Sequence, residues 1–306
     1  MSPSRPADSR IRDLVRADSE LVRLCTGATW SEGPVWLPSR GVVRWSDIPG
    51  NRILEVDATN GQVSIYLKDA EYPNGRTVDD DGTVIQCSHG RRAIEADDDG
   101  VVTILVDNWN GARFNSPNDV VVARDGTIWF TDPPYGIIRP HEGHPGTPEY
   151  GGNYVFRFDP ASGSVDAVVT DVEEPNGLAF SPDESILYIS DTSAALRTDG
   201  TGNHHIRAYR VHDGRCTDGR VFAVIDPGLP DGFRVDEHGN VWTSSENAVQ
   251  IYAPDGELLG RIPVPECVGN LCFGGPEGHT LFIAATTSIY RIETLVSDAR
   301  TVRVPA

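Results

Sequence analysis

The chain has 306 residues, of which 39% are hydrophobic, and its formal net charge at pH 7 is −19. This apolar content is enough for a sizeable core and excludes an intrinsically disordered chain. The strong negative charge argues against a nucleic-acid-binding protein, because contacts to phosphates need basic patches.

Targeting and redox signals favour the cytoplasm. No segment is apolar over the length of a signal-peptide core or a membrane span, so no membrane association is expected. The five cysteines are odd in number and scattered, and none forms a metal-binding pair. We therefore expect free thiols in a reducing compartment. The sequence makes no prediction of the oligomeric state.

Residues 1–20 precede the first repeated element and are expected to form an N-terminal extension. Segment 11–24, IRDLVRADSELVRL, is the one helix candidate. From residue 21 onward, short β-rich runs bounded by Gly, Pro, Asn and Asp follow one another without amphipathic helices between them. This pattern argues against a two-domain α/β fold.

One element, a polar turn followed by a β-rich run, occurs six times, at 39–47, 80–88, 124–132, 183–191, 237–245 and 277–285. A third run and usually a fourth follow each copy. The spacing resembles the repeat of roughly 40–45 residues that is typical of propeller blades. We therefore predict an all-β six-bladed β-propeller with four-stranded blades, one domain over residues 21–306. Two longer intervals contain insertions near 133–152 and 192–205, and either 21–25 or 301–304 closes the last blade.

The first strand of each predicted blade begins with an oxygen-bearing side chain. Because first strands line the central channel of a propeller, these side chains are expected to form a ring at one mouth. Buried carboxylates need a counter-charge, and all-oxygen donors suit a hard divalent ion, calcium above magnesium or manganese, with zinc fitting less well. Pro-Asn-Gly is also an ordinary turn, but six aligned copies favour a metal site. The ring residues are Glu32, Asn74, Asn118, Asn176, Asp231 and Asn270.

The connections from second to third strand return to the same mouth, and both insertions belong to them. They contain His89, Asp191 and Tyr135, while Arg113 precedes the ring residue Asn118. Long loops on one face commonly determine binding specificity. No GxSxG motif is present, so a Ser-His-Asp triad has no support.

The motifs WSEGPVW, CSHGRR, SPNDVVVARDGTIWFTDPPYG and EPNGLAFSPDESILYISDT resemble the gluconolactonase/regucalcin family, and the resemblance covers about residues 25–295. It implies one catalytic divalent ion held by Glu32, Asn118, Asn176 and Asp231. Asn74 would then face the substrate or support the ligands. The implied reaction is hydrolysis of a sugar lactone, an aldonolactone, to the aldonic acid, with the ion polarising the lactone carbonyl.

Within that chemistry, Asp231 is the expected base that activates water, and Asp191 is the alternative at the rim. Asn118 could contact substrate hydroxyls as well as the ion. The other substrate-binding candidates are His89, Arg113, Asn74 and Tyr135, each of which could instead support a loop.

Two further functions use the same ring. The first is a lactonase or phosphotriesterase for a non-sugar substrate, which an apolar rim would favour. The second is a non-catalytic calcium-binding propeller, in which the protein would fill every coordination position of the ion. The expected partner in the leading hypothesis is a small-molecule lactone.

Overall fold

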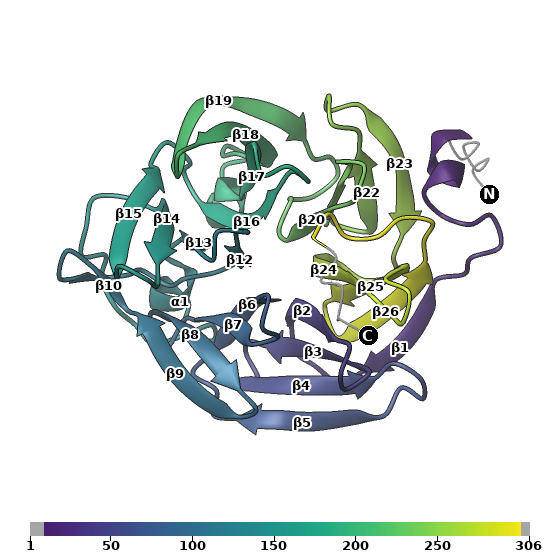
Figure 1. Cartoon of the computed structure of the whole chain (residues 1–306), viewed down its shortest axis with the longest axis horizontal. Helices are drawn as coiled ribbons and strands as arrows, with labels where there is room; N and C mark the ends of the chain where they lie inside the picture. The colour runs from purple at the N-terminus through teal and green to yellow at the C-terminus, as the bar shows by residue number, and fades with distance from the viewer. Residues whose placement is uncertain (1–8, 301–306) are drawn as a thin grey trace.

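Each sequence repeat folds into an antiparallel sheet of four strands. The computed structural model describes residues 9–300, and within this range six such sheets surround a central axis as the blades of a β-propeller (Figure 1). The predicted fold class is thereby confirmed. In every blade the first strand lies nearest the axis and contacts the first strands of the neighbouring blades. The loops that lead into these inner strands therefore meet around the axis.

Blades one to three follow the chain order from the inner to the outer strand. Blade one consists of β2 (Ser31–Leu37), β3 (Val42–Asp47), β4 (Arg52–Asp57) and β5 (Val63–Lys68). Blade two consists of β6 (Pro73–Val78), β7 (Val84–Ser88), β8 (Ala93–Asp98) and β9 (Val101–Val106). Blade three consists of β12 (Val120–Val122), β13 (Ile128–Asp132), β14 (Tyr154–Asp159) and β15 (Ser164–Val169).

Blades four to six complete the ring. Blade four consists of β16 (Pro175–Phe180), β17 (Ile186–Asp191), β18 (His205–His212) and β19 (Arg215–Val224). Blade five consists of β20 (Phe233–Val235), β21 (Val241–Thr243), β22 (Ala248–Tyr252) and β23 (Leu258–Pro263). Blade six consists of β24 (Val268–Gly274), β25 (Thr280–Ala285), β26 (Ser288–Glu293) and, as its outer strand, β1 (Val22–Thr26).

The ring is closed by a strand from the beginning of the chain. Strand β1 pairs antiparallel with β26, with Val22 opposite Arg291. The N-terminal segment thus supplies the fourth strand of the last blade. The other closing candidate, 301–304, lies outside the described residues. The division into an extension at 1–20 and a domain at 21–306 stays a prediction.

The helix expected over 11–24 is wrong. The structure has only a 3₁₀ turn, η1 (Ser9–Asp13), before β1. Leu14 is buried against the core of blades five and six, and Val22–Thr26 gain backbone hydrogen bonds only by pairing with β26. Tertiary pairing therefore overrides the weak helical pattern. Among residues 9–300, no helix is long and apolar enough to cross a membrane.

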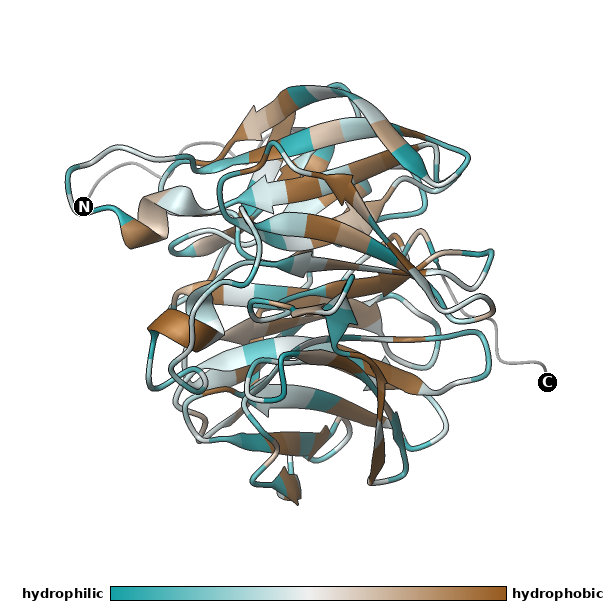
Figure 2. Ribbon diagram, turned by 90° about the vertical axis from the view of Figure 1, so that its left-hand side faces the viewer, coloured by the Kyte–Doolittle hydropathy of each residue, from teal (hydrophilic) through white to brown (hydrophobic). Residues whose placement is uncertain are grey.

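Apolar side chains fill the spaces between blades. Trp45, Trp129 and Trp242, on the second strands of alternate blades, are almost fully buried. Trp242 packs edge-on against Phe273 of the next blade, with 5.4 Å between ring centroids. Figure 2 shows hydrophobic residues concentrated within strands and hydrophilic residues at many loops. This packing holds adjacent first strands in register around the axis.

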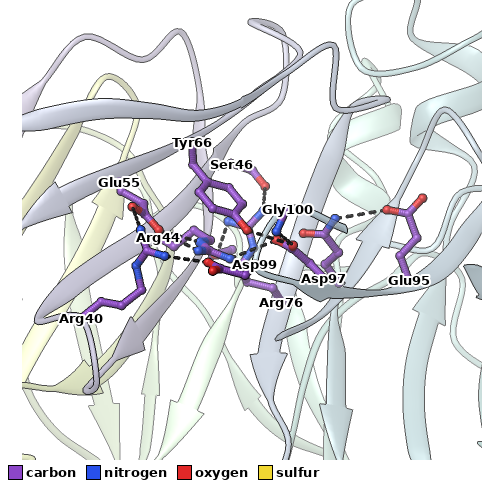
Figure 3. A network of polar contacts seen from close by, with 12 residues as sticks. Arg40, Arg44, Ser46, Glu55, Tyr66, Arg76, Glu95, Asp97, Asp99 and Gly100 are labelled. Atoms are coloured by element: carbon purple, nitrogen blue, oxygen red, sulfur yellow. Dashed lines mark hydrogen bonds and ion pairs between the residues drawn. The ribbon is translucent and has the colours of Figure 1, made fainter. Parts of the chain in front are cut away.

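A charged network joins blade one to blade two (Figure 3). Arg44 donates to Glu55 at 2.7 Å and to Asp97 at 3.0 Å, and its guanidinium lies 3.4 Å from the centre of the Tyr66 ring. The Tyr66 hydroxyl donates to the second oxygen of Asp97 at 3.0 Å, and Arg40 donates to the second oxygen of Glu55 at 3.1 Å. Both buried carboxylates, Glu55 and Asp97, therefore have a partner of opposite charge.

Three short elements lie outside the blades. Strands β10 (Asn108–Trp109) and β11 (Ala112–Arg113) form a small hairpin between blades two and three. Helix α1 (Tyr135–Ile138) begins the first predicted insertion, and η2 (Ser193–Leu196) begins the second. Contacts join the two insertions to each other, from Arg139 to the carbonyl of Ala195 and from Tyr135 to Thr192.

Candidate active site at the mouth of the propeller

Glycines next to the ring residues explain how six inner loops can meet. The backbone N–H of Gly75 donates to the carbonyl of Asn118 at 2.8 Å, and the N–H of Gly177 donates to the carbonyl of Asp231 at 3.1 Å. A Cβ atom at either glycine would clash with the carbonyl that it approaches. The Asn-Gly pairs are therefore more than turns, because the glycine permits contact between the inner strands of neighbouring blades.

The predicted ring residues all occupy equivalent places at or just before their inner strands. Asp231 is half-buried, whereas the other members are buried: Glu32, Asn74, Asn118, Asn176 and Asn270. The structure thus brings all six side chains to the start of the inner strands, as the repeat alignment indicates.

Two carboxylates of this ring lie close together, and within residues 9–300 neither forms an ion pair with a basic side chain. Glu32 Oε2 accepts a hydrogen bond from the N–H of Gly33 at 3.0 Å, but the buried Oε1 has no hydrogen-bond partner. Burial, followed by the negative charge of Asp231, raises the pKa of Glu32 well above its ordinary value. Burial, followed by the negative charges of Glu142 and Asp119, raises the pKa of Asp231 to about 7. The arrangement favours a bound positive charge.

The donor set fits a hard divalent ion. Glu32 Oε1 is an unpartnered buried carboxylate oxygen, and Asp231 adds a second carboxylate. The amide nitrogen of Asn176 donates to Thr192 Oγ1 at 3.3 Å, which leaves its oxygen available to a cation. Within residues 9–300, no three His, Cys, Asp or Glu side chains group as metal ligands, so an ion here would rely on amide oxygens from Asn118 and Asn176 as well.

Asp119 is an acidic neighbour that the repeat alignment does not single out. It is buried directly after Asn118, its Oδ2 has no hydrogen-bond partner, and Arg234 lies 3.7 Å away. Burial raises the pKa of Asp119, and the Arg234 charge lowers it. The only sequence signal for it is the Asp of SPND, which no other ring segment shares.

His89 contacts a ring residue and is fully buried. Its Nδ1 lies 2.9 Å from the carbonyl oxygen of Glu142, and its Nε2 lies 3.0 Å from the amide nitrogen of Asn74. Because a carbonyl only accepts, Nδ1 carries the proton and Nε2 accepts from Asn74. Burial lowers the pKa of His89, which favours this neutral form. His89 therefore orients Asn74 with the amide oxygen directed away from the imidazole.

Asp191, the alternative base, is a hydrogen-bond acceptor for its own loop. Its carboxylate accepts from the backbone N–H groups of Glu173 at 3.0 Å and Glu174 at 3.2 Å, and from the side chain of Asn203 at 2.9 Å. Asp47 at the same place in blade one accepts from two backbone N–H groups that precede Glu32. The Asp that ends these second strands thus fixes the segment leading to the ring, and this geometry favours a positioning role for Asp191.

The remaining two candidates differ in location. The Tyr135 hydroxyl lies 2.6 Å from Thr192 Oγ1, the same oxygen that accepts from Asn176, so Tyr135 is linked to the ring through Thr192. Arg113 is exposed and donates to the carbonyl of Arg91 at 3.1 Å. The structure places Tyr135 beside the site and Arg113 on the adjoining hairpin.

The sequence analysis missed two residues of the first insertion that are linked to the site, Glu142 through His89 and Arg139 through Tyr135. Arg139 donates to Glu142 Oε1 at 2.9 Å and to the carbonyl of Ala195 in the second insertion at 3.4 Å. The negative charge of Glu142 is second only to burial in raising the pKa of Asp231. Both residues belong to a segment of the chain that has no counterpart in the other repeats. An alignment of the repeats therefore contains no signal for them.

The fold and this site define a six-bladed propeller with an acidic, oxygen-lined centre at one mouth. The chain belongs to the family described as SMP-30/gluconolactonase/LRE-like, whose sequence model matches residues 30–287. The resemblance inferred from the motifs is confirmed.

Individual relatives agree with this assignment. A gluconolactonase of Zymomonas mobilis is 34% identical over 93% of this chain and 84% of its own length. A pentonolactonase of Haloferax volcanii is 30% identical over 84% of this chain and 82% of its own. A solved gluconolactonase of Xanthomonas campestris has a TM-score of 0.86 and 39% identity, and the match covers 96% of each chain. These relatives confirm the expectation of a hydrolase of the lactonase type.

Proposed function

We propose that this protein hydrolyses a sugar lactone of the aldonolactone type to the corresponding aldonic acid. The observation that carries the proposal is the pair Glu32 and Asp231, two close carboxylates without a counter-charge, among amide oxygens and below a polar rim. Relatives named gluconolactonase and pentonolactonase support the substrate class. The partner is therefore a small molecule.

The proposed cofactor is one divalent ion, calcium first, with magnesium, manganese and zinc as alternatives. Glu32, Asn118, Asn176 and Asp231 would hold it, because all four supply the oxygen donors that calcium prefers. Such an ion supplies Lewis-acid polarisation of the lactone carbonyl.

The side chains of this protein then orient the substrate and move a proton. Water forms the new bond to the carbonyl carbon while an Asp231 carboxylate oxygen takes up one of its protons. Collapse of the tetrahedral intermediate breaks the ring C–O bond, and the proton passes to the departing alkoxide, which becomes the new hydroxyl.

Amide groups at the ring position the lactone. The amide oxygen of Asn74, directed by its hydrogen bond to His89, is available to a substrate hydroxyl. Asn118 could likewise donate to a hydroxyl through its amide nitrogen.

We also propose a cytoplasmic location, which is supported by the absence of any disulfide among the five cysteines.

The test is hydrolysis of δ-gluconolactone by chelator-treated protein, with calcium, magnesium, manganese or zinc added back. We expect one or more ions to restore a rate above spontaneous hydrolysis, and Asp231→Ala to abolish it. No enzymatic rate with any ion would refute the sugar-lactone proposal. Activity that survives complete chelation would refute the metal requirement alone.

A further inference from the structure

The Arg139–Glu142 pair lies at the mouth of the site and has free hydrogen-bonding atoms. The side chains are 32% and 16% exposed, and Arg139 Nη1 donates to Glu142 Oε1 at 2.9 Å. Within residues 9–300, Arg139 Nε and Glu142 Oε2 make no hydrogen bond to the protein. The pair therefore offers donors and acceptors to a third molecule.

The Arg139 side chain and the backbone of Glu142 are both held by further contacts. The Arg139 guanidinium lies 4.9 Å from the centre of the Tyr135 ring, and it donates to the carbonyl of Ala195 at 3.4 Å. The carbonyl of Glu142 accepts from His89, which in turn contacts Asn74. An ion pair fixed by contacts to blade two and to the second insertion loses little conformational entropy when a ligand binds.

The pair also lies near the reacting centre. The carbonyl of Glu142 lies 2.9 Å from His89 Nδ1, and His89 Nε2 lies 3.0 Å from the amide nitrogen of the ring residue Asn74. Tyr135, over which Arg139 stacks, is linked through Thr192 to Asn176. A lactone whose carbonyl lies at the ring would direct the substituents of its far side toward the insertion.

We infer that Arg139 and Glu142 form a clamp for adjacent hydroxyl groups of the substrate, and that this clamp selects polyhydroxylated lactones over unsubstituted ones. Guanidinium only donates and carboxylate only accepts, whereas a hydroxyl does both, so two neighbouring hydroxyls satisfy the pair together. An unsubstituted ring would remove water from both charges without replacing its hydrogen bonds. This inference rests on the proposed lactonase function and adds the residues that determine its substrate.

The kinetic test compares δ-gluconolactone with δ-valerolactone, which has the same ring size and no hydroxyls. Arg139→Met and Glu142→Gln should each lower the ratio of the two kcat/KM values about 10- to 100-fold, mainly through KM for the sugar lactone. Using the ratio removes any effect that a variant has on both substrates alike, including the effect of the Glu142 charge on Asp231.

A matched control is an ion pair between the second insertion and the loop before β16. Arg197 and Glu173 form an ion pair at 2.7 Å, but their side chains are 44% and 49% exposed. Arg197→Met and Glu173→Gln should leave the ratio within twofold. A ratio unchanged in Arg139→Met and Glu142→Gln, or an equal fall in the control variants, would overturn the clamp.

A binding experiment separates the clamp from the proposed reaction. 1,5-Anhydro-D-glucitol has the ring and the hydroxyls but no carbonyl, and its affinity can be measured by saturation-transfer NMR. We expect wild-type protein to bind it and both clamp variants to bind at least tenfold more weakly. Equal binding by all variants, or no binding by the wild type, would refute the clamp. Binding through the clamp without gluconolactone hydrolysis would instead refute the proposed function.

Discussion

Two regions of this molecule bury carboxylates in opposite ways. In the network between blades one and two, Arg44 bonds both Glu55 and Asp97, and every acid has a basic or hydroxyl partner (Figure 3). At the ring, Glu32 has a buried oxygen without a partner, and Asp231 is its close neighbour. The charges of Glu55 and Asp97 are neutralised within the fold, whereas the ring leaves negative charge for a ligand to neutralise.

The largest effect is expected at Glu32, and it distinguishes a carboxylate that binds a ligand from one that stabilises the fold. Glu32→Gln preserves size but removes one of two ring charges, so calcium affinity and kcat/KM should each fall about 10²- to 10³-fold. The Tm of the metal-free variant should stay or rise, because an uncompensated carboxylate is gone. Calorimetric calcium titration and thermal unfolding measure both.

The control is an acid from the network. Glu55→Gln should lower the Tm because it weakens the contact with Arg44, and calcium affinity should not change. If Glu32→Gln instead destabilises the metal-free protein and binds calcium normally, the ring is structural and the contrast between the regions is wrong.

The converse prediction concerns the network itself. Arg44→Met leaves Glu55 and Asp97 buried without their shared cation, so the free energy of unfolding should fall by about 3–5 kcal/mol. Activity below the unfolding transition should stay within twofold. Urea unfolding followed by tryptophan fluorescence measures the loss.

Arg40 supplies the matched comparison. Its side chain is 42% exposed and it pairs with Asp99, which is 82% exposed. It also donates to one oxygen of Glu55, whose other oxygen keeps its bond to Arg44, so Arg40→Met should cost at most about 1 kcal/mol. Equal losses for Arg40→Met and Arg44→Met would show that burial does not decide the value of these ion pairs.

The two regions also differ in how far the sequence predicts them. The ring could be found because its members recur at the same place in every repeat, and repetition turns six ordinary residues into one pattern. Asp97 and Arg44 come from non-equivalent positions in different blades, so their pairing depends on the packed structure.

The rim of the site shows most clearly what cannot be predicted from the sequence. Arg139 and Glu142 belong to an insertion without a repeat partner, and only its folding over the ring makes them neighbours of Asp231. The sequence locates Asp191 at the rim, but the backbone N–H groups that its carboxylate accepts from are identified only by the three-dimensional contacts. Local pattern predicts the strands, and tertiary contact decides what a loop side chain does.

The uncompensated charge at the ring predicts a pH dependence. The ordinary pKa values of Glu32 and Asp231 are 4.5 and 3.8, and both are raised in the folded protein, that of Asp231 to about 7. The metal-free folded state therefore binds more protons than the unfolded state between about pH 4 and 7, so its stability should fall as pH rises through this range.

Calcium should oppose that fall. Because the ion binds the ionised carboxylates, the rise in Tm on adding calcium should be larger at pH 8 than at pH 5. Burial also raises the pKa values of Asp132 and Glu174 to about 7. Part of the decrease in stability with pH should therefore remain both with and without calcium. Thermal unfolding at pH 5, 6, 7 and 8 with chelator or calcium tests this, and parallel curves would contradict it.

A smaller effect is expected at Asp191. Asp191→Asn removes one acceptor from a loop anchor, so kcat/KM should fall about tenfold and the free energy of unfolding by about 1–3 kcal/mol. The pH profile of kcat should keep its shape. Asp47→Asn, at the same place in blade one, should behave similarly. If Asp191→Asn alone lowers kcat/KM 10³-fold or more and removes the acidic limb of the pH profile, Asp191 is the base.

The smallest effect is expected at Arg113, and measuring it tests how far the substrate-binding site extends. Its side chain is exposed and donates to the carbonyl of Arg91, in the connection between β7 and β8. Arg113→Ala should change the free energy of unfolding by less than about 0.5 kcal/mol and KM for δ-gluconolactone less than twofold. Arg139→Met, measured beside it, should raise the same KM at least tenfold. If Arg113→Ala raises KM as much as Arg139→Met does, the substrate extends over the hairpin as well, and the polar rim reaches from blade two to blade four.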